Sequence, residues 1–368
     1  MRSDTEAAIL HKIHATTTHA TTTKRRGANG KPRRSPPRRD SRSAYPSAHS
    51  EKAQAALLRC HWSPRSPMLA VTYDPPAVTI ELAAAGQTLL SGSWSASVKV
   101  EGRSLPPAGS WEQVCWQSDY DVDYLELAAQ LAPSWRIERH MLLCRSDRFL
   151  LLGDCILGNE RKRIDYEGTV PMATGIGLNE ASETRECTLY AERRSAANRR
   201  ASATSRSSVT MQAGNGQANG SGRPRSDALR GTLASSPGEA RALVLPVALG
   251  EWRGDDSAGR LVAEGERLAL SQTAIGGALY APLFIDLDPR RIEQPRTWRR
   301  LTVATRLKAE PPDVASGFRI QVGSRQWLIY RALACRDNRT VLGHNLLSEF
   351  FVGRFSRKGT AQSLLEIE

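Results

Sequence analysis

The chain has 368 residues, a formal net charge of +13 and a pI near 9.8, so its length alone allows two or three domains. No window approaches the ~18 consecutive apolar residues of a membrane span. The N-terminal region also lacks the apolar core of a secretory signal. As written, the sequence therefore predicts a cytoplasmic protein, and an extracytoplasmic location stays open if the true N-terminus differs.

The first part of the chain is basic and poor in apolar residues. Residues 1–59 contain 13 Lys and Arg against 4 Asp and Glu, among many Thr, Ser, Ala and Pro residues. Such a composition buries too little apolar surface to fold, so we expect a disordered basic tail with a short helix-like stretch at 51–59. The basic run at 24–39 fits either a solvated tail or a weak, salt-dependent contact with nucleic acid.

Strand patterns begin after this tail and follow one another closely. Alternation is clear at 94–100, where Trp94, Val98 and Val100 face one side while Ser95 and Lys99 face the other. Further strand-like runs precede residue 193: MLAVTY, AVTIELA, WEQVCW, YDVDYLELAAQL, WRIERHMLLC, RFLLLGDCIL, RIDYEGTVPM and CTLYAE.

A second basic segment interrupts the strands at 193–241. It contains 9 Arg against 2 acidic residues and is rich in Gly, Ser and Asn, which predicts a disordered insertion. This insertion and residues 1–59 together carry +16, so the rest of the chain carries −3. Strand-like runs then resume: ALVLPVAL, RLVAEGERLALSQT, ALYAPLFIDL, TWRRLTVATRL, GFRIQVG, RQWLIYRALA, NLLSEFFVGRF and QSLLEIE.

These runs predict an all-β fold. Many short strands with turn signals between them, and almost no helical periodicity, are typical of a large antiparallel β-sandwich. We place this sandwich, of supersandwich type, at residues 65–368, interrupted by the insertion at 193–241.

Several familiar catalytic motifs are absent. The sequence has no phosphate-binding loop, no G-x-S-x-G elbow and no H-E-x-x-H zinc motif. Its six cysteines are widely spaced, and several lie in apolar strand patterns, which favours buried free thiols. We therefore predict no cofactor from these patterns.

The acidic run SDYDVDYLE is the one place where a metal is considered. On a strand, Asp119, Asp121 and Asp123 would share one face, where a Ca²⁺ ion or basic partners would relieve their repulsion. Both a calcium site and a solvated or arginine-paired edge remain open.

Proton-transfer groups are scarce in the predicted domain. His140 and His344 are its two histidines, and either fits a general base or a structural role. If the chain is an enzyme, the nearest candidate cluster in sequence is Tyr120, Tyr124, Arg139 and His140.

Tryptophan is overrepresented among the aromatic residues. Most of the eight tryptophans fall within or beside predicted strands, where they fill a core or offer a platform for sugar rings. Trp111 and Trp116 are the candidate platform.

One stretch resembles a known family. Residues 95–102 read SASVKVEG, Trp111 and Trp116 follow, and ERHMLLCRSDRFLLLGDCILG ends at Gly158. This order is similar to the C-terminal β-sandwich domain of the heparinase II/III family of polysaccharide lyases. The resemblance implies a β-sandwich and a link to acidic polysaccharides. At the position of the family's reactive histidine this chain has Ser95, and the residues before the fold leave no room for the family's helical toroid.

Three functions follow as alternatives. The favoured one is a non-catalytic heparinase-like module that binds a glycan or has a structural role, because serine cannot replace an imidazole in proton transfer. The second is a lyase-type enzyme acting on acidic glycans. The third is weak binding of nucleic acid through the basic segments.

Overall fold

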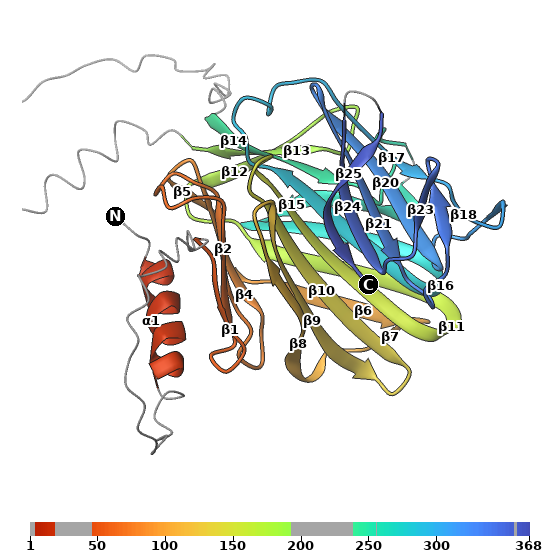
Figure 1. Cartoon of the computed structure of the whole chain (residues 1–368), viewed down its shortest axis with the longest axis horizontal. Coiled ribbons are helices and arrows are strands. Elements are labelled where there is room, and N and C mark those ends of the chain that lie inside the picture. Colours follow the sequence, from red (N-terminus) through yellow and green to blue (C-terminus); the bar gives the residue numbers. More distant parts are fainter. Residues whose placement is uncertain (1–3, 19–45, 193–237, 255, 357–358) are drawn as a thin grey trace, which may run out of the picture.

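The computed structural model describes residues 4–18, 46–192, 238–254, 256–356 and 359–368. Its β-strands form three layers, with a small extra sheet at one end (Figure 1). All strand pairs are antiparallel, so the predicted all-β antiparallel sandwich is confirmed.

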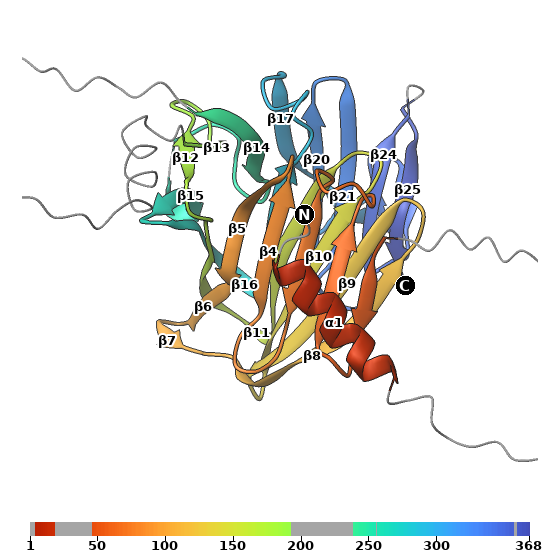
Figure 2. The ribbon, with the colours of Figure 1, turned by 90° about the vertical axis from the view of Figure 1, so that its left-hand side faces the viewer.

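The first layer is a five-stranded sheet with one helix on its outer face (Figure 2). Ile9 and Ile13 of α1 (Asp4–Thr18) lie in one apolar cluster with Leu57 and Met68 of the sheet. The strands follow chain order: β1 (Ala48–Ser50), β2 (Ala55–Arg59), β3 (Met68–Thr72), β4 (Thr79–Ala84) and β5 (Gln87–Ser93).

The middle layer is the largest sheet and contains the two longest strands, which pair with each other. Its spatial order is β12-β13-β14-β16-β11-β10-β9-β8, with β15 beside β16, β6 beside β11 and β7 beside β6. The strands are β6 (Ser95–Val100), β7 (Arg103–Ser104), β8 (Ala108–Ser118), β9 (Val122–Ala132), β10 (Trp135–Cys144), β11 (Phe149–Pro171), β12 (Ile176–Glu180), β13 (Cys187–Ala191), β14 (Glu239–Pro246), β15 (Gly259–Glu264) and β16 (Arg267–Asp286).

The third layer is a five-stranded sheet, and the small four-stranded sheet continues beside it. In spatial order the third layer contains β17 (Arg296–Leu301), β20 (Ala315–Val322), β21 (Arg325–Ala332), β24 (Phe350–Phe355) and β25 (Ala361–Ile367). The small sheet contains β19 (Lys308–Ala309), β18 (Val303–Thr305), β22 (Arg339–Val341) and β23 (His344–Leu346).

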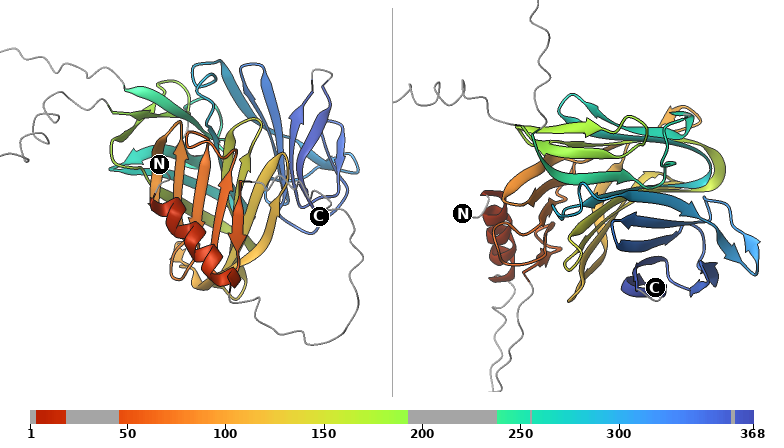
Figure 3. Two further views of the ribbon diagram at one scale, coloured as in Figure 1. Left: turned by 60° about the vertical axis from the view of Figure 1, so that its left-hand side comes forward. Right: turned by 90° about the horizontal axis from the view of Figure 1, so that it is seen from above.

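The layers lie against one another in Figure 3. Two apolar cores fill the spaces between them. Leu143 and Leu150 belong to the core shared with the first layer, whereas Leu142 and Leu151 belong to the core shared with the third. Because the middle sheet is covered on both faces, β10 and β11 read as continuous apolar runs rather than as alternating ones.

The structure differs from the sequence prediction at the N-terminal side. Residues 51–59 were expected to be helix-like and to lie outside the fold, but β2 occupies 55–59 and β1 lies just before it. All five residues of β2 are buried between α1 and the middle layer, so tertiary packing decides their conformation. The sandwich thus begins at β1 rather than at residue 65, and Glu239–Arg241 at the expected end of the insertion belong to β14.

Most of the two basic segments lies outside the described residues, including the run at 24–39 and residues 193–237. Residues 4–18 of the expected tail form α1 and pack on the first layer, so the predicted disorder is wrong there. For the residues outside the described ranges the disorder stays a prediction, as does the nucleic-acid contact. Within the described part, no helix is both long enough and apolar enough to cross a membrane.

Candidate functional site

A pocket of about 850 Å³ opens at one edge of the gap between the middle and third layers. We call it the Arg331 pocket, after the arginine that enters it from the end of β21. The start of β10, the adjacent part of β11 and the loop after β21 form its walls. Residues that define it are Gln130, Trp135, Arg136, Glu138, Asn159 and Arg331, with Asp313, Cys335, Arg336 and Glu349 at the rim.

A chain of polar contacts leads from this pocket into the core. Nη2 of Arg331 donates hydrogen bonds to Oε1 of Glu126 and Oε2 of Glu138, each at 2.7 Å. Arg136 Nε donates to Glu138 at 2.9 Å on the pocket side, and the Tyr124 hydroxyl donates to Glu126 at 2.7 Å on the core side. The cluster thus pairs two carboxylates with two guanidinium groups in a largely buried place.

Arg331 retains unused donor capacity. Its side chain is buried, yet Nε and Nη1 have no hydrogen-bond partner within the described structure. Desolvation by burial acts to lower its pKa, but Cys155, Glu126, Tyr124 and Glu138 together raise that pKa well above the usual value. Arg331 is thus a fixed cation that can still donate hydrogen bonds.

His140 and two tyrosines lie behind this cluster, on the faces of β9, β10 and β16 that meet the third layer. The Tyr280 hydroxyl is 2.8 Å from Nε2 of His140, and the rings of Tyr124 and Phe350 pack beside the imidazole. Gly153 faces His140 on β11, where a Cβ would come within 2.5 Å of Nε2. The absence of a side chain at this position therefore makes room for the imidazole.

Burial makes these groups poor acid–base catalysts near neutral pH. Desolvation, assisted by the charge of Arg331, lowers the pKa of His140 well below its usual value. Desolvation and the Glu126 carboxylate raise the pKa of Tyr124 well above its usual value, and desolvation does the same to Tyr280. All three side chains stay uncharged across the physiological range.

Trp135 forms one wall of the Arg331 pocket. A Cβ on Gly158 would lie 2.5 Å from its ring, so the ring sits directly against the β11 backbone. Gln130 also secures this corner, since its Nε2 donates to the carbonyl of Trp135 at 3.0 Å. The wall is therefore held by close packing and by hydrogen bonding.

The four residues proposed for lyase chemistry are not assembled in a cleft. Tyr124 and His140 are neighbours, but both are buried in the core between the middle and third layers. Arg139 faces the opposite core, and Tyr120 is 78% exposed in the turn before β9. The predicted cluster is therefore divided among three environments.

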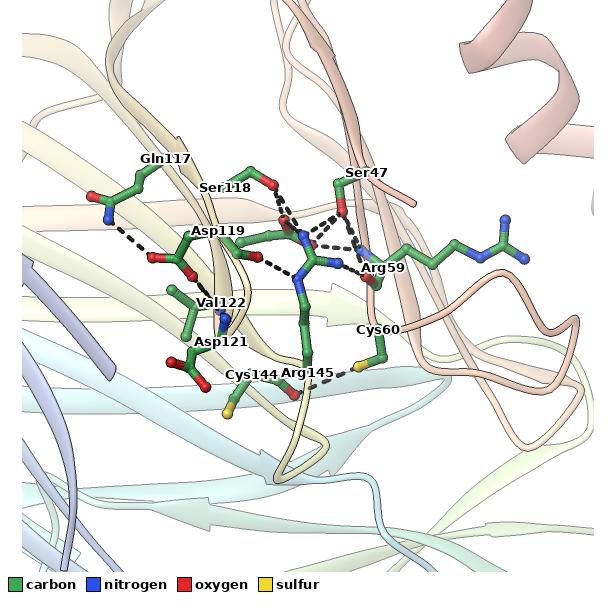
Figure 4. A network of polar contacts seen from close by, with 11 residues as sticks. Ser47, Arg59, Cys60, Gln117, Ser118, Asp119, Asp121, Val122, Cys144 and Arg145 are labelled. Atoms are coloured by element: carbon green, nitrogen blue, oxygen red, sulfur yellow. Dashed lines mark hydrogen bonds and ion pairs between the residues drawn. The ribbon is translucent and has the colours of Figure 1, made fainter. Parts of the chain in front are cut away.

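The three aspartates do not share a strand face, contrary to prediction. Figure 4 shows Asp119 and Asp121 with the residues around them. Asp119 and Asp121 lie in the turn between β8 and β9, where Asp119 Oδ1 accepts the backbone N–H groups of Asp121 and Val122. Asp123 is buried and pairs with Arg145. Because Asp119 accepts the backbone N–H groups of this turn, the segment is not a strand, and the alternation predicted for a strand does not apply to it.

Asp123 has both of its oxygens in use. They accept hydrogen bonds from Ser47, Ser118, Arg145 and the backbone N–H of Arg59. Burial raises its pKa, and these partners oppose that shift. Among the described residues, no three His, Cys, Asp or Glu side chains are grouped to hold a metal ion.

The two candidate platform tryptophans and Ser95 lie away from the Arg331 pocket. Trp111 is 4% exposed and stacks on Arg139, while Trp116 is half-buried and stacks on His49. The Ser95 hydroxyl is 2.6 Å from that of Thr169 on β11. None of these side chains lines the pocket.

Glu126, Glu138 and Arg331 were not among the residues predicted from the sequence. Each interrupts an apolar strand run, in YLELAAQL, WRIERHMLL and WLIYRALA. Charged side chains in such runs need buried partners, and this signal could have identified them. Their pairing could not be predicted from the sequence, because Arg331 follows Glu126 by 205 residues and Glu138 by 193 residues.

No protein-family model and no curated protein matches the sequence. The solved structures similar to it include heparan sulfate lyase HepC from Pedobacter heparinus, with a TM-score of 0.44 and 9% identity over 77% of this chain and 42% of that chain. A heparinase III gene product (BT4657) has a TM-score of 0.45 and 8% identity over 78% of this chain and 42% of that chain. The chain thus spans about two-fifths of the length of these structures.

Proposed function

We propose that this domain is a non-catalytic glycan-binding module that holds a saccharide segment in the Arg331 pocket. The observation that carries the proposal is the chemistry of the pocket wall. Arg136, Glu138, Asn159 and Arg331 present planar groups with fixed donors and acceptors beside Trp135. Such groups recognise the paired hydroxyls of a sugar ring, and an aromatic ring packs against its apolar face.

Charge pairing within the pocket favours hydroxyl-rich ligands over dense polyanions. Arg136 lies 2.8 Å from Glu138, and Arg336 lies 3.7 Å from Glu349. A sulfate or carboxylate would have to separate these pairs, whereas a hydroxyl can donate to the carboxylate and accept from the guanidinium at once. We therefore expect neutral glycans to bind at least as well as the acidic polysaccharides that the family resemblance suggested.

Lyase chemistry has less support than binding. A lyase needs a base that reaches the substrate, but His140 and Tyr124 do not line the pocket. Ser95, at the position where the resemblance expects histidine, has a hydroxyl engaged with Thr169. These observations support a module that binds without cleaving.

The test combines binding with a product assay. We would measure binding of a neutral glucan, a polyuronate and heparan sulfate by affinity electrophoresis and calorimetry. Ultraviolet absorbance would follow the unsaturated product that a lyase makes. We expect binding without any rise in absorbance. Arg136→Gln should weaken binding about tenfold, because one charged hydrogen-bond partner is lost.

Arg163→Gln is the matched control for this variant. Arg163 also lies two residues from its acidic partner on a strand, and its side chain is 59% exposed, against 57% for Arg136. It does not line the Arg331 pocket, so its loss should leave affinity unchanged. Equal losses in both variants, or no binding to any glycan, would refute the assignment. A steady rise in absorbance would show that the protein is a lyase.

A further inference from the structure

A second pocket, of about 270 Å³, lies on the other side of Asp313 from the Arg331 pocket, and Asp313 lines both. Gly276 lets the Asp313 loop approach β16, because a Cβ there would lie 2.6 Å from that of Asp313. The Asp313 carboxylate accepts the N–H of Gly277 at 2.9 Å. The Asp313 loop therefore separates the second pocket from the first, and we call the second pocket the Arg300 pocket.

A buried amide in this pocket has an unused acceptor. Gln272 on β16 is 6% exposed, and its Nε2 donates to the carbonyl of Tyr280 at 3.2 Å. Its Oε1 is buried and has no hydrogen-bond partner within the described structure. A buried acceptor in this state is costly, and a ligand hydroxyl would satisfy it.

Arg300 supplies a cation without a matching carboxylate. It donates to the carbonyl of Ala248 at 3.2 Å, and none of the described acidic side chains forms an ion pair with it. Arg300 is an exposed residue whose guanidinium also lies over the Phe318 ring, 5.7 Å from the ring centroid, and desolvation lowers its pKa. Arg161, the other arginine of the pocket, is already 3.4 Å from Asp313. The surplus positive charge of the pocket is therefore on Arg300.

We propose that the Arg300 pocket binds a small organic anion that also carries hydroxyl groups. Its anionic group pairs with the Arg300 guanidinium, and a hydroxyl donates to Oε1 of Gln272. The volume is just below the range usual for drug-sized ligands, so the occupant is a small free molecule such as a hydroxy acid. This assignment does not depend on glycan binding at the Arg331 pocket.

Three matched probes test the two contacts separately. Gluconate carries both a carboxylate and hydroxyls, hexanoate lacks the hydroxyls, and sorbitol lacks the charge. We would measure their binding to the full chain by calorimetry and by thermal shift. Gluconate should bind about tenfold or more tightly than either of the others, because each of them loses one of the two contacts. Equal responses to all three probes would overturn the proposal.

Variants then locate the site. Arg300→Gln should reduce gluconate affinity about tenfold or more. Arg299→Gln is the matched control, since the preceding residue on β17 does not line the pocket. Arg136→Gln tests whether gluconate enters the Arg331 pocket instead. The proposal would be overturned if either control variant lost gluconate binding while Arg300→Gln kept it. It would also be overturned if the protein bound the acid only as part of a polyuronate.

Discussion

Replacing Arg139 by methionine should strongly destabilise the sandwich without changing the Arg331 pocket. Arg139 is fully buried, and its Nε and Nη2 each donate to Asp154 at 2.8 Å. Nη1 donates to the carbonyl of Trp94 at 2.6 Å, and the guanidinium lies 3.8 Å from the Trp94 ring. Methionine keeps much of the apolar stem but leaves the Asp154 carboxylate buried and without its cation.

The expected loss is large because the pair has no access to water. Removing one member of a buried ion pair costs about 3–5 kcal/mol. That loss is a large share of the ~5–15 kcal/mol by which domains are usually stable. By contrast, Arg163→Gln breaks a pair whose arginine is mostly exposed, and should cost at most about 1 kcal/mol.

Chemical denaturation of each variant would provide the measurement, with glycan affinity measured on the folded protein. The double variant Arg139→Met/Asp154→Leu should regain much of the stability, because it removes both charges. It also remains useful if the single variant does not accumulate. A loss for Arg139→Met no greater than that for Arg163→Gln would refute the structural role of Arg139. If Arg139→Met instead lost glycan binding at unchanged stability, Arg139 would belong to the functional site.

Three further predictions concern pH, thiol reactivity and packing. The folded pKa of His140 is far below that of the unfolded chain, so the unfolded state alone binds a proton there. The free energy of unfolding should therefore fall by about 1.4 kcal/mol per pH unit below pH ~6.5, and the His140→Gln variant should lack this pH dependence. If the unfolding free energies of the two proteins change with pH in parallel, the burial of a neutral imidazole is contradicted. All six cysteines are described, and Cys335 alone is exposed, so a thiol reagent should label one cysteine per native chain. Because Cys335 lines the Arg331 pocket, bound glycan should slow that labelling. An unchanged labelling rate would argue against glycan in the pocket. Gly158→Ala should displace Trp135, cost about 1–3 kcal/mol and shift tryptophan fluorescence, whereas an unchanged spectrum and midpoint would contradict the close contact.

The sequence by itself determined the class of the fold. Strand runs between turn residues predicted an antiparallel β-sandwich, because side-chain alternation and turn chemistry are local properties. The same local signals gave the wrong element at 55–59 and the wrong geometry at Asp119–Asp123. In both places the outcome depends on what the segment contacts: β2 is buried between α1 and the middle layer, and Asp119 accepts the hydrogen bonds of its own turn.

Only the tertiary structure decided which polar residues meet. Sequence proximity grouped Arg139 with His140, yet adjacent residues on a strand face opposite sides, and here both sides are buried cores. The Arg331 pocket instead joins β10 to β21, and the Arg300 pocket joins β16 to β17. Pairing across layers is set by the order of strands in the sheets, which strand patterns alone do not encode. The pattern therefore predicted that a sandwich forms, and its folding determined which side chains line the two pockets.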